Sequence, residues 1–210
     1  MALQIVHEDE RLVAVAKPAG LPTAPGGGVD AAATLLAQVA AHIGSPAFIV
    51  HRLDRETSGV IVFARSPEAH RELSRQFEGR QVTKRYLALV AGHVDGRDGE
   101  ISQPLREFGS GRVGVDPKGR EAVTRWQLRE RVRDADLLEL MPLTGRRHQI
   151  RVHCYDIGHP ILGDTRYGDP RPVGGAPRLM LHATELVLAD GLRLAAEPPP
   201  DFVAVLEASR

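Results

Sequence analysis

A carboxylate lies between two arginines in the segment HRLDRETSGV, residues 51–60, where Asp54 is flanked by Arg52 and Arg55. The segment runs directly into the apolar stretch GVIVFA, residues 59–64, which is typical of a buried strand. The simplest interpretation of Asp54 is a surface ion pair with one of the arginines. The alternative is a nucleophile, or a carboxylate facing a developing cation, because a nearby guanidinium keeps a carboxyl group ionised. Spacing alone leaves both interpretations open.

Two further side chains could act beside such a carboxylate. Arg151 lies in the most basic short window of the chain, residues 143–153, which also holds Arg146 and Arg147 and no acidic residue. The plain alternative for Arg151 is a solvated helix residue. Tyr86 lies in the strand-like segment KRYLALVAG, where a tyrosine is usually half-buried packing. Its functional alternative is a stacking surface or a proton acceptor beside a bound base.

The histidines and the single cysteine do not predict a metal or nucleophile site. The chain has nine histidines, but His148 and His153 are five residues apart and no HxH or HExxH pattern occurs. Such spacing does not place two imidazoles on one face, so a zinc site is not expected. The sequence also lacks a GxSxG motif for serine nucleophile chemistry. Cys154 lies on an apolar helix face, which favours buried packing.

Composition indicates a globular chain in a reducing compartment. The 210 residues are 42% hydrophobic and 26% charged, which is enough to bury a core. The formal net charge is zero, which argues mildly against a nucleic-acid partner, although basic segments surround the candidate site. One cysteine excludes an intramolecular disulfide. We find no signal peptide and no apolar stretch of about 20 residues, so we expect a soluble cytoplasmic protein.

Hydrophobic periodicity and turn signals predict the elements that must position these residues. In the first part of the chain, Ser66 and Pro67 mark a helix start, and Gly44 marks a helix end. The expected elements there are a hairpin at 3–17, a helix at 31–44, a strand at 59–64, a helix at 66–78 and a strand at 84–92.

The second part of the chain mixes strands with one helix. Residues 93–120 are rich in glycine and charge, so we expect a mobile loop pair. A strand pair is expected at 121–132 and 135–143, a helix within 144–160, a flexible loop at 169–177, and a hairpin at 179–197 that turns at Asp190-Gly191. Because regular strand–helix alternation is absent, the sequence predicts an α+β fold with a mostly antiparallel sheet, in a single domain covering 1–210.

Five segments, in order, resemble the RluA-type branch of the pseudouridine synthases. HRLDRETSGVIVFARS (51–66) resembles the catalytic-aspartate segment of that family, and KRYLALVAG (84–92) resembles its tyrosine segment. LTGRRHQIRVHCYDIGHPILGDTRYG (143–168) is similar to its arginine segment. VHEDERLVAVAKPAGLPTAPG (6–26) and RLMLHATEL (178–186) match in character and order. Together the five segments cover most of residues 3–190.

The resemblance implies isomerisation of uridine in RNA to pseudouridine, with no cofactor and no metal. It implies a mixed, mostly antiparallel sheet flanked by helices, with a central catalytic cleft. By match of position, Asp54 is the nucleophile, Tyr86 packs on the target base and Arg151 pairs with Asp54. The substrate- and RNA-binding residues implied are Arg52, which could fill the space left by the flipped base, Leu181, which walls the pocket, and Arg55 and Arg147 on the basic rim.

The resemblance also sets expectations about partners. Many relatives carry a small RNA-binding extension ahead of the catalytic domain, and this sequence starts directly at the catalytic hairpin, so no separate N-terminal RNA-binding domain is expected. Recognition by one domain favours a compact stem-loop of ribosomal RNA or tRNA. We expect a monomer with no DNA or membrane partner. Two alternatives remain: an RNA-binding module on the same fold without catalysis, and a hydrolase that uses Asp54 with a second carboxylate such as Glu56.

Overall fold

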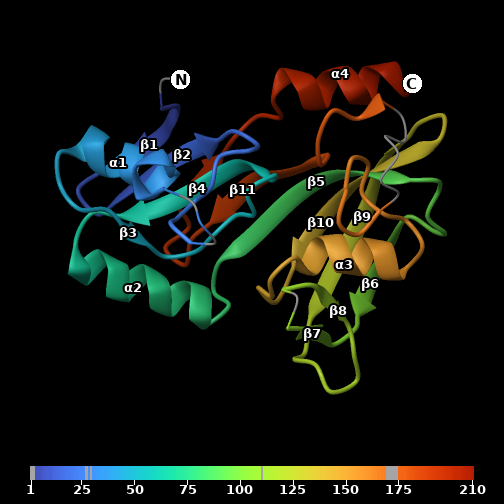
Figure 1. Ribbon diagram of the computed structural model, residues 1–210, viewed down its shortest axis with the longest axis horizontal. Helices are drawn as coiled ribbons and strands as arrows, with labels where there is room; N and C mark the ends of the chain where they lie inside the picture. The colour runs from blue at the N-terminus through green and yellow to red at the C-terminus, as the bar shows by residue number, and fades with distance from the viewer. Residues whose placement is uncertain (1–2, 27, 29, 110, 169–174) are drawn as a thin grey trace. The chain divides into compact units, whose positions relative to one another are not determined.

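The computed structural model describes residues 3–26, 28, 30–109, 111–168 and 175–210 (Figure 1). The chain forms two compact units. The first unit comprises Met1–Thr83 and Ala183–Pro198. The second unit comprises Lys84–His182 and Pro199–Arg210. Whether the whole chain acts as one catalytic domain stays a prediction.

The first unit is built on antiparallel strand pairs. Strand β1 pairs with β2, β2 with β4, β3 with β4, and β11 with β12, each antiparallel. Helix α2 packs against β3 and β4. The elements are β1 (Ile5–Glu8), β2 (Leu12–Lys17), η1 (Ala31–Ala33), α1 (Leu35–Ile43), β3 (Phe48–Ile49), β4 (Ser58–Ala64), α2 (Pro67–Glu78), β11 (Leu181–Val187), which starts in the second unit, and β12 (Arg193–Ala195).

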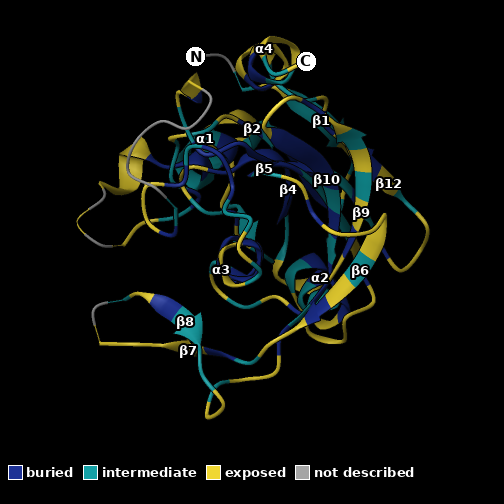
Figure 2. Cartoon of the chain, turned by 90° about the vertical axis from the view of Figure 1, so that its right-hand side faces the viewer, coloured by how far each residue is buried: buried dark blue, intermediate teal, exposed yellow. Residues whose placement is uncertain are grey.

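Local signals in the sequence explain these elements. The hydroxyls of Thr34 and Ser66 accept hydrogen bonds from the first turns of α1 and α2, as helix caps do. Gly44 ends α1 in the left-handed conformation that glycine adopts readily. Strand β4 is buried along its whole length, as its continuous apolar run predicts (Figure 2). The predicted hairpins at 3–17 and 179–197, the helices and the buried strand are therefore confirmed.

The second unit contains a four-stranded antiparallel arrangement in the order β5-β10-β9-β6. A separate two-stranded ribbon, β7 with β8, contacts α3 through β8. Helix α3 also packs against β9 and β10 (Figure 1). The elements are β5 (Thr83–Ala91), β6 (Asp98–Ser102), β7 (Leu105–Glu107), β8 (Val113–Val115), β9 (Val123–Arg131), β10 (Ala135–Pro142), α3 (Gln149–Asp156) and α4 (Pro200–Ala208).

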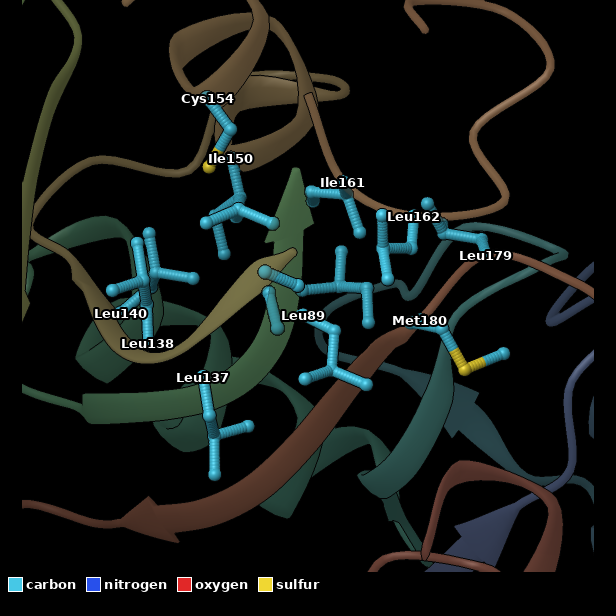
Figure 3. Close-up of a cluster of buried hydrophobic side chains, with 14 of the residues drawn as sticks. Leu89, Leu137, Leu138, Leu140, Ile150, Cys154, Ile161, Leu162, Leu179 and Met180 are labelled. Atoms are coloured by element: carbon cyan, nitrogen blue, oxygen red, sulfur yellow. The ribbon is translucent and has the colours of Figure 1, made fainter. Parts of the chain in front are cut away.

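One apolar core holds α3 against the strands of the second unit. Figure 3 shows Ile150 and Cys154 of α3 directed toward Leu138 and Leu140 of β10, in a cluster that also contains Leu89 of β5. The helical spacing of Ile150 and Cys154 thus marks a core face, and the predicted buried packing of Cys154 is confirmed. Burial raises the pKa of this thiol to about 12, so it stays protonated.

One expectation was wrong, and one helix was not predicted. Residues 93–120 are not a loop pair, because β6, β7 and β8 lie within them. Glycine and charge obscured these short strands, and pairing of β6 with β9 stabilises what local propensity does not. The helix expected within 144–160 is confirmed as α3, which begins at Gln149, whereas α4 near the C-terminus was not predicted. Of the predicted loop at 169–177, residues 169–174 lie outside the described residues.

The class and sheet type agree with the prediction. The fold is α+β, and its sheet is mixed and mostly antiparallel. In the part of the chain that the structure describes, we find no helix long and apolar enough to cross a bilayer.

Candidate active site

Asp54 lies in the loop that leads into β4, and the backbone of this loop is held from both sides. The amide N–H of Thr57 donates to the carbonyl oxygen of Asp54 at 3.2 Å, which forms a tight turn around the carboxylate. The buried hydroxyl of Thr23 donates to the carbonyl of Leu53 at 2.9 Å. Leu53 itself is buried, whereas Asp54 is half-buried. The loop is therefore anchored by main-chain groups while the Asp54 carboxylate stays within reach of solvent.

Lys17 is the strongest anchor of this loop, and sequence reasoning missed it. Only 1% of Lys17 is exposed, and its ammonium donates to the carbonyls of Pro18 and Leu21, both at 2.9 Å, and of Arg55 at 3.0 Å. An ammonium has three donors, so these carbonyls match its full capacity. The feature of the sequence that could have identified Lys17 is its place as a lysine at the end of the apolar run VAVAK. Lys17 joins the loop after β2 to the Asp54 loop.

The two arginines beside Asp54 are exposed. Arg55 donates from Nε to the carbonyl of Gly20 at 2.9 Å, and Gly20 N–H donates back to the carbonyl of Arg55 at 2.8 Å. Arg52 lies on the other side of the aspartate. Exposed guanidinium groups next to a half-buried carboxylate can contact phosphates without being desolvated.

Tyr86 lies on β5, opposite Leu140 of β10. It is half-buried and packs against the core cluster of the second unit. This agrees with half-buried packing, and it leaves part of the ring accessible as a surface on which a planar group could stack. Leu181, at the start of β11, is buried and belongs to the same cluster.

Arg151 is not a solvated helix residue, so that alternative is wrong. Only 4% of Arg151 is exposed, and its guanidinium makes a two-point ion pair with Asp164: Nε to Oδ2 at 2.8 Å and Nη2 to Oδ1 at 2.8 Å. Burial by itself would raise the pKa of Asp164, but the Arg151 guanidinium and two backbone N–H donors hold it below its ordinary value. The pair is therefore charged and buried. The pairing of Arg151 with Asp54 stays a prediction.

An aromatic side chain covers this ion pair. The Arg151 guanidinium carbon lies 5.2 Å from the centroid of the Tyr167 ring, within the range of a cation–π contact. The Tyr167 hydroxyl lies 2.7 Å from His148 Nδ1 and accepts from the Val113 N–H at 3.0 Å. His148 precedes α3 with a φ of 54°, a conformation that few non-glycine residues adopt. The helix start, the ion pair and the β7–β8 ribbon thus share one hydrogen-bonded network.

Arg147 is exposed at the turn before α3 and forms an ion pair with Glu107 of β7. The predicted site residues therefore fall into two groups, one in each unit. Asp54, Arg52 and Arg55 share the first unit, whereas Tyr86, Arg147, Arg151 and Leu181 share the second. Sequence reasoning did not single out Asp164 and Tyr167, although both lie in the quoted segment GDTRYG. The feature of the sequence that could have identified them is the pair of glycines on either side of this aspartate and tyrosine.

Among residues 3–26, 28, 30–109, 111–168 and 175–210, no group of three or more histidine, cysteine, aspartate or glutamate side chains could hold a metal ion. Every buried side-chain nitrogen or oxygen within the same ranges has a hydrogen-bond partner.

Comparison with known proteins gives consistent matches. A family model of RNA pseudouridylate synthase matches residues 11–156. The dual-specificity RNA pseudouridine synthase RluA of Haemophilus influenzae is 40% identical over 192 residues, covering 89% of this chain and 86% of the relative. The ribosomal large subunit pseudouridine synthase C of Vibrio cholerae is 37% identical over 210 residues, covering 97% and 66%.

The fold also matches a solved structure. Human RNA pseudouridylate synthase domain containing 4 superimposes with a TM-score of 0.83 at 29% identity, covering 98% of this chain and 92% of that one. The matched stretch of the family model includes Asp54, Tyr86 and Arg151, and it excludes Leu181.

Proposed function

The chain belongs to the RNA pseudouridylate synthase family, and on that premise we propose that it isomerises specific uridines in a stem-loop of ribosomal RNA or tRNA, with Asp54 as the nucleophile. The chain is an RNA pseudouridine synthase of the RluA type, an isomerase whose partner is RNA. The observation that carries the reaction class is the family match over residues 11–156. The names of the relatives, one dual-specificity and one for the large ribosomal subunit, support the choice of RNA classes.

The reaction exchanges one glycosidic bond for another. The N1–C1′ bond of uridine breaks, the C5–C1′ bond forms, and the proton on C5 is released while N1 gains one. The target base is stacked within RNA, so it must be extruded before its glycosidic bond can be reached. The exposed arginines Arg52, Arg55 and Arg147 would hold the phosphates, and Arg52 would fill the space that the base leaves. These contacts supply affinity that does not depend on the target sequence.

Within this proposal each site residue has a defined role. Asp54 attacks the sugar or assists the departure of uracil, and in either role it must be ionised. Its half-buried position at the end of a held loop leaves the residue partly accessible to a bound substrate. Tyr86 offers a stacking surface to the extruded base and is one candidate for the base that removes the C5 proton. Arg151 is the cationic partner of Asp54, and Leu181 forms an apolar wall of the pocket.

We also propose that residues 1–210 act as one catalytic domain and as a monomer in the cytoplasm, without a DNA or membrane partner. The single cysteine, which is buried, supports a reducing compartment. The mass in solution, measured by light scattering with and without RNA, tests the oligomeric state. A stable dimer in the absence of RNA would contradict the monomer.

Tritium release from RNA labelled at C5 of uridine tests the proposed function. Purified protein is offered unmodified ribosomal and tRNA transcripts, beside the variants Asp54→Asn and Glu56→Gln. We expect release by the wild type and by Glu56→Gln, and a loss of at least about 1000-fold in Asp54→Asn, because the amide cannot act as a nucleophile. Glu56 is the matched control, since it is an exposed carboxylate of the same loop.

Other outcomes decide between the alternatives. Release by Asp54→Asn at the wild-type rate would show that Asp54 is not the nucleophile. Binding of RNA without release by any protein would favour a non-catalytic binding module. Free uracil among the products, together with a loss of activity in Glu56→Gln, would favour a hydrolase with two carboxylates.

A further inference from the structure

Asp164 is a buried carboxylate, and both of its oxygens accept hydrogen bonds. Only 2% of the residue is exposed. Oδ2 accepts from Arg151 Nε, and Oδ1 accepts from Arg151 Nη2 at 2.8 Å, from the backbone N–H of Arg166 at 2.9 Å and from that of Tyr167 at 3.0 Å. The backbone donors fix the carboxylate on its own turn. The carboxylate in turn fixes one edge of the guanidinium.

The turn that carries Asp164 is shaped by glycines on both sides. Gly163 has a φ of +74°, and a Cβ there would lie 1.8 Å from the carbonyl oxygen of Arg178. A Cβ on Gly168 would lie 2.7 Å from the carbonyl oxygen of Asp164. The chain can therefore follow this tight path only with glycine at both positions. The backbone that carries Asp164 is therefore restricted to this path.

The same turn presents Tyr167, which closes the network from the other side. Tyr167 is buried in a small cluster with Leu105, Val113 and Val152. Its ring lies over the Arg151 guanidinium, and its hydroxyl connects His148 with the backbone of β8. Arg151 is thus held along its Nε–Nη2 edge and over one face. The Nη1 side is directed away from Asp164.

We propose that Asp164 is a positioning residue for Arg151, which keeps the guanidinium in one orientation so that its remaining donors act on the reacting site. This inference rests on the proposed role of Arg151 in uridine isomerisation. Asp164 does not touch the substrate in this scheme. Tyr167 assists by preventing the guanidinium plane from tilting.

Stability alone is a weak reason for this arrangement. Desolvating two charges often costs as much as their attraction returns, and apolar replacements of buried ion pairs are frequently neutral or stabilising. An arginine side chain also has many rotamers, so a free guanidinium would be poorly directed. A two-point bond to a fixed carboxylate removes that freedom, because both groups are planar and match in geometry.

A second ion pair in the same unit provides the matched control. Arg178 donates to Asp201 from Nε at 2.6 Å and from Nη2 at 2.8 Å, with the same two-point geometry. The Asp201 side chain is 44% exposed, and it has no part in the proposed reaction. A variant that lacks this pair therefore shows how far the loss of an ion pair outside the proposed reaction changes the rate.

The experiment compares Asp164→Asn, Asp164→Glu, Arg151→Lys and Asp201→Asn in tritium release under single-turnover conditions, with RNA affinity measured separately. We expect Asp164→Asn to lower the rate of the chemical step by about 100-fold, because misplacement of a catalytic group by about 1 Å has this effect. RNA affinity should change by less than about threefold, since Asp164 makes no RNA contact in this scheme. Asp201→Asn should keep the wild-type rate.

Two further variants keep the inference testable if Asp164→Asn does not fold. Asp164→Glu retains the charge and shifts the carboxylate, and it should lower the rate at least about tenfold with unchanged affinity. In an Arg151→Lys background, Asp164→Asn should lower the rate much less, because lysine cannot form the two-point bond. A wild-type rate in Asp164→Asn or Asp164→Glu, with Arg151→Lys impaired, would overturn the inference alone. Equal effects of Asp164→Asn in both backgrounds would overturn it too.

Failure of the proposed function would give different results. If the wild type releases no tritium, the isomerase assignment fails, and this inference fails with it. If the wild type is active and Arg151→Lys is fully active, the role of Arg151 is wrong, and no residue is needed to position it.

Discussion

The loop of Asp54 and the turn of Asp164 each hold a candidate active-site side chain in place, but they do so through different contacts. The Asp54 loop is held by its main chain, since the ammonium of Lys17 binds the carbonyl of Arg55 and the hydroxyl of Thr23 binds that of Leu53. Arg151 is held by its own side chain, through the two-point bond to Asp164. In the first region the backbone is fixed and the proposed nucleophile, Asp54, stays half-exposed. In the second the guanidinium of Arg151, its proposed partner, is itself fixed and buried.

Side-chain length explains the difference. Aspartate has two rotatable bonds, so its carboxylate is largely placed once the backbone is placed. Arginine loses about 2 kcal/mol of rotamer freedom when it is ordered, and only contacts at its far end can direct the guanidinium. The comparison teaches that a short reactive side chain is positioned through its loop, whereas a long one needs a partner of its own.

The largest effect on stability is expected from removing the anchor of the first region. Lys17→Met leaves the carbonyls of Pro18, Leu21 and Arg55 without their buried donor, so the free energy of unfolding should fall by about 3 kcal/mol. Urea denaturation measures this, and hydrogen exchange should show faster opening of residues 53–57. Lys118→Met, at an exposed lysine, should change the free energy by less than about 0.5 kcal/mol. A loss below about 1 kcal/mol in Lys17→Met would contradict the proposed anchoring.

An intermediate effect is expected from acid, and it should separate the buried pair from an exposed one. The pKa of Asp164 is below its ordinary value of 3.8 in the folded protein, so this group stabilises the fold above that pH. Its contribution is lost as the pH falls from 3.8 through the folded pKa, with a slope of at most about 1.4 kcal/mol per pH unit. Asp164→Asn should lack this component of the acid-unfolding profile.

The control for the acid experiment is Asp190, whose pKa is lowered by a hydrogen bond from Arg11 at a largely exposed position. Its contribution lies in the same pH range, but 0.5 M salt should weaken it strongly, because exposed pairs are screened. The contribution of Asp164 should persist in the same salt. If salt weakened the contributions of Asp164 and Asp190 equally, the Asp164 pair would be open to solvent, and the contrast between a buried and an exposed pair would be wrong.

The smallest effect is expected at the exposed arginines of the two regions. Arg55→Gln and Arg147→Gln should each reduce the magnitude of the negative slope of log affinity against log salt by about 0.7 to 0.9, with an unchanged rate of the chemical step. Glu107→Gln should strengthen RNA binding, since it releases Arg147 from its ion pair. Filter binding at several salt concentrations measures all three. An unchanged slope in Arg147→Gln would indicate that this arginine serves only its ion pair with Glu107.

Much of the fold could be predicted from local sequence signals. The caps at Thr34 and Ser66, the glycine at the end of α1 and the apolar run of β4 each signal their element within a few residues. The short strands β6, β7 and β8 could not be predicted, because each is stabilised by pairing with another strand and not by its own composition. The Asp54 segment was recognisable because its residues are contiguous.

The α+β class, the reaction family and the candidate residues Asp54, Tyr86 and Arg151 could all be predicted from the amino-acid sequence. How Asp54 and Arg151 are held in place could be learned only from the folded chain. Lys17 and Arg55 are 38 residues apart, Thr23 and Leu53 are 30 apart, and Val113 and Tyr167 are 54 apart. Such contacts form when packing brings distant segments together and every buried donor must find an acceptor. Local sequence propensity does not predict contacts between distant segments, so these anchors could not be found without the folded chain.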